Sequence, residues 1–230
     1  MLTVPMHILV VDDEPQIRRF LRTSLNAQGY RISETGSAVE AVALAAKERP
    51  DLVILDLGLP DGEGFDVIER LRLSSQVPIV VLSVRNDEQG KVRALDLGAD
   101  DYITKPFGME ELMARLRTAL RHRLQIQGET PIFRSGALSV DLVRRIVTVA
   151  DNEVKLSAKE YDLLRLLVAH SGRVLTHGFL LKEVWGPAHA EDVQYLRVYI
   201  RQLREKLEAD PTRPQLILTE TGVGYRLRAD

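Results

Sequence analysis

Cysteine is missing from this chain of 230 residues. Its absence excludes disulfide bonds, thiolate metal sites and thiol catalysis, and it is compatible with a reducing compartment. Long apolar runs are missing too, since no stretch approaches the roughly 18 residues that a membrane span needs. The N-terminal MLTVPMHILVV lacks a basic region and is followed too soon by acidic residues to be a signal peptide. We therefore expect a soluble, cytoplasmic protein with no membrane partner.

A large charge of either sign is also absent, since the formal net charge is only -2. Residues 1–124 carry 16 basic and 19 acidic side chains, and residues 125–230 carry 15 and 14. This small difference does not by itself indicate a nucleic-acid-binding protein, so the local placement of charge has to decide. With 45% hydrophobic residues the chain has enough apolar material for a core, and its length favours two compact domains.

The first half alternates short apolar strands with amphipathic helices. Strands are predicted at residues 7–11, 31–35, 52–56, 79–83 and 101–104, and helices at residues 15–26, 37–47, 65–73, 87–97 and 109–124. In the first helix Ile17, Phe20, Leu21 and Leu25 recur at the helical period and predict its buried face. Five consecutive strand–helix units predict an α/β fold with a doubly wound, five-stranded parallel sheet.

A polar stretch, QIQGETP at residues 125–131, interrupts this pattern and is predicted to be a linker. Beyond it, strands are expected at residues 138–140, 146–149 and 154–156, helices at 158–169, 176–184 and 192–207, and a two-stranded hairpin at 216–219 and 225–227. We therefore predict three parts, namely a domain at residues 1–124, the linker at 125–131, and a smaller α+β domain at residues 132–230.

Polar side chains stand where the strands of the first half end. Asp12 and Asp13 follow the first strand, Asp56 ends the third within DLVILDLGLPDGEG, Ser83 ends the fourth, and Lys105 follows the fifth. The glycine- and proline-rich continuation after Asp56 is predicted to be an irregular loop. Because open α/β sheets bind ligands at the carboxyl ends of their strands, we expect these side chains to converge on one site.

An acidic pocket that offers only oxygen ligands suits Mg²⁺, which binds one or two carboxylates together with water and phosphate oxygens. A carboxylate between such a cation and a lysine is arranged to attack phosphorus, because both cations stabilise the charge of the transferred phosphoryl group. Each residue alone has an ordinary explanation, as a turn-forming acid, a loop hydroxyl or a solvated lysine. Their coincidence at successive strand ends favours a phosphorylation site.

The segments LVVDDE, DLVILDLGLPDGEG, VVLS and GADDYITKPF resemble the receiver domain of two-component response regulators, and the resemblance covers residues 7–123. It implies that Asp56 accepts a phosphoryl group from a sensor histidine kinase. It further implies that Mg²⁺ is held by Asp12, Asp13, Asp56 and the Gly58 carbonyl, that the phosphoryl group is contacted by Ser83 and Lys105, and that the inward-turning switch is Tyr102. For Tyr102 alone, an ordinary strand aromatic is the simpler explanation.

The segment EDVQYLRVYIRQLREKLE, residues 191–208, predicts an amphipathic helix. Val193, Leu196, Ile200, Leu203 and Leu207 recur at helical spacing and form one buried stripe. The other faces carry arginine and glutamine, which suit phosphates and base edges in the major groove of DNA. The residues predicted to contact DNA from this helix are Gln194, Arg197, Val198, Tyr199, Arg201 and Arg204. The alternative is a solvated charged face.

Four segments, LSAKEYDLLRLLV, LLKEVWG, YIRQLREKLE and TETGVGYR, resemble the effector domain of the OmpR/PhoB family over residues 132–228. This resemblance implies a winged helix-turn-helix that binds promoter DNA, with RNA polymerase as a further partner. Trp185 would contact a DNA phosphate, although core packing explains it equally well, and Thr221 would reach the minor groove from the wing. Glu220 is a departure, because an acid in the wing disfavours phosphate contact. Within the family, DLGLPDGEG and TETGVGYR are similar to regulators of potassium transport.

A third candidate surface consists of charged residues between positions 91 and 117, namely Lys91, Asp96, Asp101, Glu111, Arg115 and Arg117. From the same resemblance we expect a homodimer on activation, in which Lys91–Glu111, Asp101–Arg115 and Asp96–Arg117 pair across subunits. Complementary charges fix the register of a two-fold interface even where they add little affinity. The alternative is again a solvated face, on which an isolated ion pair contributes about 0–1 kcal/mol.

Other functional classes are less well supported by the sequence. An aspartyl-phosphate phosphatase also uses an Asp at a strand end, but it needs a second Asp two residues later, where this chain has Gly58. A P-loop sequence is absent, and the lone GVG lies in the predicted hairpin. The five histidines do not stand at metal-ligand spacing. We therefore expect a regulator and not an enzyme, with a phosphatase-like enzyme as the alternative.

Overall fold

The computed structural model describes residues 5–84, 88–126, 128 and 130–229. The chain divides into two compact units at the junction between residues 129 and 130. Each unit has its own sheets and its own hydrophobic core, and each is described by itself. Residues 127 and 129 of the predicted linker lie outside the described residues, as does residue 87, the predicted start of the fourth helix.

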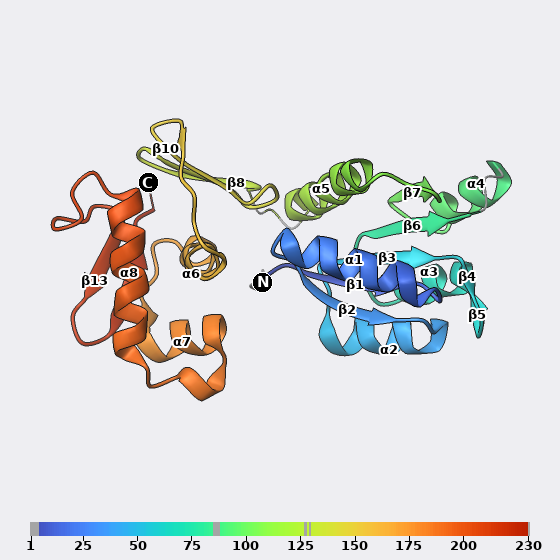
Figure 1. Ribbon diagram of the computed structural model, residues 1–230, viewed down its shortest axis with the longest axis horizontal. Helices are drawn as coiled ribbons and strands as arrows, with labels where there is room; N and C mark the ends of the chain where they lie inside the picture. Colours follow the sequence, from blue (N-terminus) through green and yellow to red (C-terminus); the bar gives the residue numbers. More distant parts are fainter. Residues whose placement is uncertain (1–4, 85–87, 127, 129, 230) are drawn as a thin grey trace. The chain divides into compact units, whose positions relative to one another are not determined.

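The first unit is built around a five-stranded parallel sheet (Figure 1). Its strands, in spatial order, are β2 (Arg31–Thr35), β1 (His7–Val11), β3 (Leu52–Asp56), β6 (Ile79–Ser83) and β7 (Asp101–Thr104). Every residue of β1, β3 and β6 is buried, because helices cover both faces of a doubly wound sheet. The predicted fold class of this half is confirmed.

The helices described in the first unit begin and end within two residues of the predicted positions. They are α1 (Pro15–Ala27), α2 (Ala38–Glu48), α3 (Gly64–Arg72), α4 (Glu88–Asp96) and α5 (Met109–Ile126). α5 continues two residues into the segment predicted to be linker. The buried Leu124 anchors this last turn against the core, which explains why the helix does not stop there.

One residue of the predicted buried face of α1 is exposed instead. Leu21 and Leu25 are fully buried and Ile17 is half-buried, but Phe20 is 49% exposed. A helix that packs on a sheet buries only one stripe of its surface, and Phe20 lies beyond the edge of that stripe. The prediction is therefore wrong for Phe20.

The loop after β3 is more regular than predicted. Two short strands, β4 (Gly58–Leu59) and β5 (Gly62–Glu63), pair antiparallel and return the chain to α3. A Cβ on Gly64 would lie 2.6 Å from the Asp56 carbonyl oxygen, so the chain can return this closely only at a glycine. The expectation of an irregular loop is corrected, because the glycines here permit tight pairing.

The second unit begins with a four-stranded antiparallel sheet. Its strands, in spatial order, are β11 (Asn152–Glu153), β10 (Ile146–Val149), β9 (Leu138–Asp141) and β8 (Ile132–Ser135). The sequence does not predict β8, whose four residues show no clean alternation of apolar and polar side chains. Residues 154–156 are not a strand, and the prediction is wrong there. The Val154 N–H still donates to the Val147 carbonyl oxygen of β10 at 2.8 Å, and Val154 and Leu156 pack against the hydrophobic core, which produces the alternation of a strand.

Three helices and a second small sheet complete the described part of this unit. The helices are α6 (Ala158–Ala169), α7 (His177–Trp185) and α8 (Val193–Leu207), with a short 3₁₀ turn η1 (Pro187–His189) before α8. The sheet consists, in spatial order, of β12 (Leu175–Thr176), β14 (Gly224–Leu227) and β13 (Ile217–Glu220). The predicted two-stranded hairpin therefore gains a third strand. A Cβ on Gly224 would lie 1.8 Å from the Leu175 carbonyl oxygen, so this pairing depends on glycine.

α8 lies beside the β13–β14 hairpin (Figure 1). Leu196, Ile200, Leu203 and Leu207 are buried in the core of the unit, as the predicted stripe requires, and Val193 is half-buried at its start. Three helices followed by a hairpin that packs against the last of them form the predicted winged helix-turn-helix. The opposite surface of α8 is thereby left to solvent.

Candidate functional site

The strand ends of the first unit bring a lysine between two buried carboxylates. The Lys105 Nζ lies 2.6 Å from an oxygen of Asp56 and 2.8 Å from an oxygen of Asp12. It also lies 3.2 Å from an oxygen of Glu14. The Asp12 and Asp56 residues are 1% and 6% exposed. The predicted convergence of these groups on one pocket is therefore what the structure shows.

Local backbone geometry aims both carboxylates into this pocket. The last ladder partners of β1 and β3 are Val11 and Leu55, so Asp12 and Asp56 are the first residues beyond their shared ladder. The Asp12 carboxylate accepts a hydrogen bond from the backbone N–H of Glu14, at 2.9 Å. The Asp56 carboxylate accepts one from the backbone N–H of Gly58, at 3.0 Å. Each acid is thus held by the turn that follows its own strand.

Burial and charge act against each other in the pocket. Burial raises the pKa of Asp12, and the hydrogen bond from Lys105 opposes that shift. Burial alone would lower the pKa of Lys105, but its hydrogen bonds and ion pairs with Asp12 and Asp56 outweigh burial and raise that pKa. The lysine is therefore held in its charged form between the two carboxylates.

The same residues have the chemistry of a site for a hard divalent cation. Carboxylate oxygens of Asp12, Asp13, Glu14 and Asp56 all lie within 4.8 Å of one another. Asp13 and Glu14 are exposed, so the cluster opens to solvent on one side. A set of oxygen ligands that keeps access to water is what Mg²⁺ prefers. The donor set therefore fits the predicted metal.

Two further residues of this site were not predicted. Glu14 belongs to the acidic cluster and contacts Lys105. Arg18 donates from Nη1 to the backbone carbonyl oxygens of Asp12 and Asp13, at 2.5 and 3.0 Å. Glu14 could have been found as the third acid of LVVDDE. Arg18 had no such signal, because its position one helical turn after Glu14 only gains meaning once the loop is folded.

Ser83 ends β6, the strand beside that of Asp56, and Tyr102 lies on β7, one strand further out. Asp56 is paired in the ladder with Leu82, so Ser83 lies one residue further along the neighbouring strand. Ser83 is buried, and Tyr102 is buried at 4% exposure, opposite Val81. Tyr102 thus lies inward in this structure, and its coupling to a movement of Ser83 on phosphorylation stays a prediction.

The six charged residues of the third candidate surface lie on α4, β7 and α5. Lys91, Asp96 and Glu111 are exposed, and the other three are half-buried. Within a single chain, Arg115 already bonds both oxygens of Asp101, at 2.9 and 3.0 Å, and Glu111 at 2.9 Å. The structure thus brings Asp101, Glu111 and Arg115 together inside one subunit.

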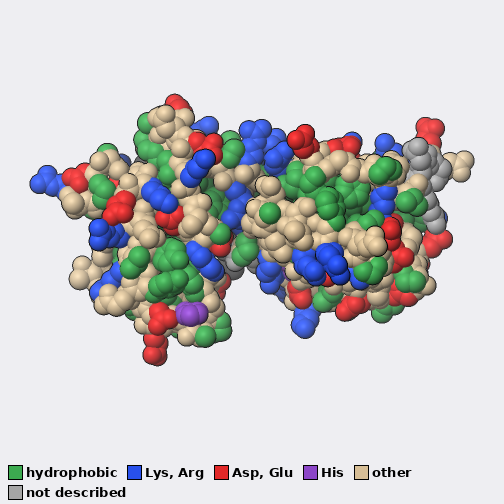
Figure 2. Space-filling model, viewed as in Figure 1, with side chains coloured by type: hydrophobic (Ala, Val, Ile, Leu, Met, Phe, Trp, Pro, Cys, Tyr) green, Lys and Arg blue, Asp and Glu red, His purple; other side chains and the backbone are tan. Residues whose placement is uncertain are grey.

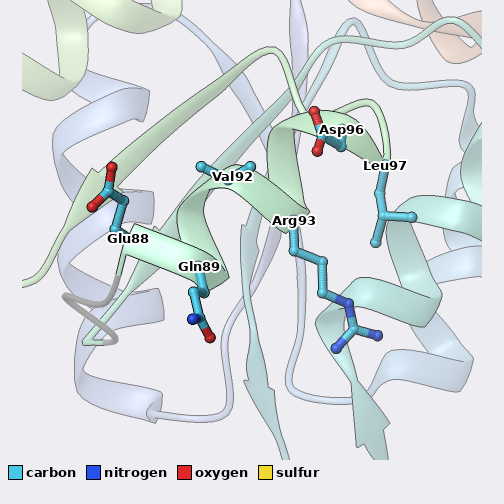
Figure 3. A pocket seen from close by; sticks show the side chains of 6 residues that line it. All are labelled: Glu88, Gln89, Val92, Arg93, Asp96 and Leu97. Atoms are coloured by element: carbon cyan, nitrogen blue, oxygen red, sulfur yellow. The ribbon is translucent and has the colours of Figure 1, made fainter.

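A shallow hollow on α4 adjoins this surface (Figure 3). It is lined by Glu88, Gln89, Val92, Arg93, Asp96 and Leu97. The Arg93 guanidinium lies over the Phe65 ring, 4.2 Å from its centroid, and 3.7 Å from a Glu63 oxygen. Arg93 therefore fastens α4 to the start of α3, while the exposed Val92 adds apolar area to the surface.

In the second unit, α8 presents a mixed polar face to solvent. Gln194, Arg197, Val198 and Arg201 are exposed, with Val198 at 50%, and Tyr199 is half-buried at the edge of this face. Arg201 forms an ion pair with Glu205 one turn later, at 2.8 Å. In Figure 2 positive and negative side chains are interspersed on the visible face of the molecule. Recognition of a polyanion would therefore depend on local geometry and not on a field of one sign.

Two of the predicted DNA contacts have internal partners. Arg204 donates to the Ile217 carbonyl oxygen at 2.6 Å and to the Thr219 hydroxyl at 2.7 Å, and so ties α8 to β13. Trp185 packs edge-on against Tyr195 and Tyr199. Its Nε1 is buried and has no hydrogen-bond partner among the described residues. For both residues the geometry supports a packing role ahead of direct contact with phosphate.

The wing tip is short and exposed. Thr221 lies in the turn between β13 and β14, next to Gly222 with its φ of 77°. Glu220 forms an ion pair with Arg226 across the hairpin, at 2.7 Å. Arg226 offsets the acid that disfavours phosphate contact, so Thr221 stays accessible in a locally neutral wing.

Nowhere in the described ranges is a helix both long enough and apolar enough to cross a membrane.

Comparisons with known proteins match both units. Residues 8–117 match the family model described as response regulator receiver domain, and residues 151–227 match transcriptional regulatory protein, C terminal. The KDP operon transcriptional regulatory protein KdpE of Escherichia coli is 48% identical over 220 residues, which cover 96% of this chain and 98% of that protein. Transcriptional regulatory protein KdpE of Mycobacterium tuberculosis is 48% identical over 223 residues, which cover 96% and 99%.

A solved structure agrees with these matches. The crystal structure of a two-component response regulator from Clostridium difficile has a TM-score of 0.50 and 30% sequence identity, and it covers 51% of this chain and 98% of that chain. Both of these relatives are KdpE proteins, which agrees with the resemblance stated within the family. The matches, the acidic pocket and the winged helix agree, and the chain belongs to the OmpR/PhoB family of two-component response regulators, which are DNA-binding regulators of transcription.

Proposed function

We propose that phosphorylation of Asp56 activates this regulator, that it then dimerises through the first unit, and that it binds promoter DNA through the second. The observation that carries the proposal is the position of Lys105, 2.6 Å from Asp56 and 2.8 Å from Asp12. Receiver domains bind Mg²⁺ at an acidic pocket, and response regulators of this family act with sensor histidine kinases. The Mg²⁺ ligands proposed in this chain are Asp12, Asp13, Asp56 and the Gly58 carbonyl oxygen.

Asp56 supplies the nucleophile. One of its carboxylate oxygens attacks the phosphorus of a phosphohistidine on the kinase, the P–N bond breaks as the new P–O bond forms, and the imidazole nitrogen keeps the electron pair and takes up a proton. Mg²⁺, when bound, neutralises charge on the phosphoryl oxygens. Lys105 exchanges its ion pair with Asp56 for one with the phosphoryl group, and the Ser83 hydroxyl donates a hydrogen bond to the same group.

Dimerisation follows from the surface of α4, β7 and α5. Movement of Ser83 toward the phosphoryl group would favour the inward position that Tyr102 occupies on β7. The proposed pairs between subunits are Lys91–Glu111, Asp101–Arg115 and Asp96–Arg117. Because Arg115 bonds Asp101 and Glu111 within the chain, pairing between subunits is an exchange of partners and not a gain of new ones. Such an exchange fixes register at little cost.

DNA recognition is assigned to the exposed face of α8. Arg197 and Arg201 are placed to reach phosphates or guanine edges, and Gln194 can pair with adenine. Val198 offers an apolar contact to a thymine methyl group, with Tyr199 beside it, and Thr221 approaches the minor groove. Two second units joined by a receiver dimer would bind tandem half-sites at a raised effective concentration. Following the relative named for the KDP operon, we propose a potassium-transport promoter as the target, with RNA polymerase as a partner there.

Labelling with a small phosphodonor tests the proposal. The full chain is incubated with acetyl phosphate and Mg²⁺, and acid-labile phosphate is measured on the wild type, Asp56→Asn, Asp13→Ala and the exposed control Asp66→Asn. Label should be lost in Asp56→Asn, fall sharply in Asp13→Ala, and stay at the wild-type level in the control. Undiminished label on Asp56→Asn would rule out the assignment.

A second experiment tests the DNA-binding part. Double-stranded DNA is selected from a random pool by the wild type, with and without acetyl phosphate. Phosphorylation should enrich one tandem repeat of half-sites. If the selected DNA shares no common sequence, with or without acetyl phosphate, specific and phosphorylation-enhanced binding is contradicted.

A further inference from the structure

Asp61 lies at the tip of the β4–β5 turn and bonds the start of another helix. Its carboxylate accepts hydrogen bonds from the Ser37 hydroxyl at 2.6 Å, the Ala38 N–H at 2.8 Å and the Val39 N–H at 3.2 Å. The N–H groups at a helix start have no partners within the helix, so an acid from elsewhere satisfies them well. The turn is therefore fastened to the first residues of α2. A Cβ on Gly62 would lie 3.4 Å from the Ala38 Cβ, so this contact is also close.

From α2 the same set of hydrogen bonds leads to Asp12. The Ser37 N–H donates to the Thr35 hydroxyl at 3.1 Å, and the Asp12 N–H donates to the Thr35 carbonyl oxygen at 3.1 Å. Thr35 is the last residue of β2 and is buried. Asp61 is thus connected through two residues to the wall of the acidic pocket that carries Asp12 and Asp13.

On its other side Asp61 belongs to the wall that carries Asp56 and Gly58. Gly58 pairs with Glu63 across the β4–β5 ladder, and Leu59 pairs with Gly62. The Gly58 N–H donates to the Asp56 carboxylate. Moving the turn that holds Asp61 would therefore move Gly58, because only Leu59 and Pro60 lie between them.

The two walls have no sheet pairing of their own at the pocket. The ladder between β1 and β3 ends at Val11 and Leu55, one residue before Asp12 and Asp56. Beyond that point, Lys105 bridges the walls directly, and the route through α2 and the residues just before it, Ser37 and Thr35, connects them from behind. Lys105 must change partner when a phosphoryl group arrives, whereas the route through α2 does not touch the reacting atoms.

We infer that Asp61 is a positioning residue, which closes the acidic pocket from behind and sets the distance between the Asp12–Asp13 wall and the Asp56–Gly58 wall. This inference rests on the proposed function for the identity of the site. It adds a determinant of how tightly the pocket holds Mg²⁺. Residues that orient metal ligands from outside the ligand set commonly change metal affinity by 10- to 100-fold when replaced.

The test measures the Mg²⁺ concentration that gives half-maximal phosphorylation of the full chain by acetyl phosphate. Asp61→Ala should raise that concentration about tenfold, with a smaller change in the rate at saturating Mg²⁺. Asp61→Asn keeps one acceptor oxygen and should give an intermediate value. Asp66→Ala removes the same charge from the exposed first turn of α3 and should behave as the wild type. Thermal unfolding of each variant shows that the measurements are made on folded protein.

The outcomes separate positioning from simple stabilisation of α2. A lower unfolding temperature of Asp61→Ala with an unchanged Mg²⁺ midpoint would overturn the inference, and so would an equal shift in Asp66→Ala. If the wild type takes no label, the proposed function fails. Titration calorimetry of Mg²⁺ with the same four proteins then decides the role of Asp61 alone, since weaker binding confined to the Asp61 variants supports it and equal binding overturns it.

Discussion

The two units use charged residues in opposite ways. In the first, the buried Asp12 and Asp56 and the half-buried Lys105 come from three strand ends, and the Lys105 Nζ lies within 2.8 Å of both carboxylates. In the second, Gln194, Arg197 and Arg201 are exposed and spread along one helix, with solvent on their outer side. The first arrangement exists only after five strands have assembled, whereas the second is present as soon as a single helix forms.

This difference determines how each site should respond to change. Charges in a buried pocket interact strongly because little water screens them, so removing one alters all the others. Exposed charges are screened by salt and contribute nearly independently. We therefore expect replacements in the pocket to be costly and coupled, and replacements on α8 to be modest and additive.

The largest effect is expected for Lys105→Met. It leaves two buried carboxylates without a counter-charge, and breaking a buried pair in this way typically costs about 3–5 kcal/mol of stability. Urea unfolding without Mg²⁺ should show the loss, and the exposed control Lys47→Met should not. Added Mg²⁺ should restore part of the stability. If Lys105→Met and Lys47→Met were equally stable, a charge in the pocket would contribute no more to stability than an exposed one, and the proposed difference between the two units would be wrong.

On α8, two arginine variants should distinguish DNA binding by Arg201 from structural stabilisation by Arg204. Arg201→Ala should weaken DNA binding by roughly 1–3 kcal/mol, or lower the salt slope by about one, while the unfolding temperature stays unchanged. Arg204→Ala removes the bonds to Ile217 and Thr219 and should destabilise the second unit by about 1–2 kcal/mol. Binding isotherms at several salt concentrations, together with thermal unfolding, distinguish them. If both variants bind DNA like the wild type, another surface reads it.

The dimer surface lies between these extremes, because Arg115 is partly buried and its partners are partly exposed. Arg115→Asp should leave Asp56 labelling intact and weaken phosphorylation-enhanced dimerisation at least roughly tenfold, which corresponds to about 1.4 kcal/mol. The exchange Asp101→Arg with Arg115→Asp should restore part of it. Sedimentation of the phosphorylated proteins measures this. Normal dimerisation of Arg115→Asp would place the interface elsewhere.

The smallest expected effect concerns pH. The hydrogen bond from the Ser37 hydroxyl and those from the Ala38 and Val39 N–H groups lower the pKa of Asp61 to about 2. Because this lies below the roughly 3.9 of an unfolded Asp, the contribution of Asp61 to stability is nearly complete above about pH 4.5 and is lost as pH falls toward 2. The difference in unfolding temperature between wild type and Asp61→Asn should therefore be constant above about pH 4.5 and shrink below it. A constant difference at all pH values would contradict the assignment.

The sequence predicts best where one signal dominates. Three strands of the first sheet, β1, β3 and β6, are largely apolar runs, and the boundaries of all five strands match the predicted ones. The acids and the lysine of the pocket could be predicted because strand ends meet at one edge. Phe20 could not be placed correctly, since a repeating apolar pattern does not show how wide the buried stripe is.

What was missed depends on contacts between distant segments. Arg204 looks like its neighbours on α8 in the sequence, and only the adjacent β13 engages it. Asp61 accepts a hydrogen bond from Ser37, just before α2 and more than 20 residues away in the sequence, and no local sequence pattern predicts that contact. β12 contains two residues and exists because Gly224 lets the chains approach. Such features belong to the assembled fold and have no signature in a single segment.

The hydrogen bonds from Arg18 fix the backbone at Asp12 and Asp13 independently of the charge on their side chains. Arg18 holds backbone carbonyl oxygens, which every residue possesses, and not the carboxylates of Asp12 and Asp13. The loop can therefore keep its path when an acid is replaced by its amide. The acids of the pocket can therefore be substituted, for example to bind a different metal or to leave the pocket uncharged, without a change in the backbone that carries them.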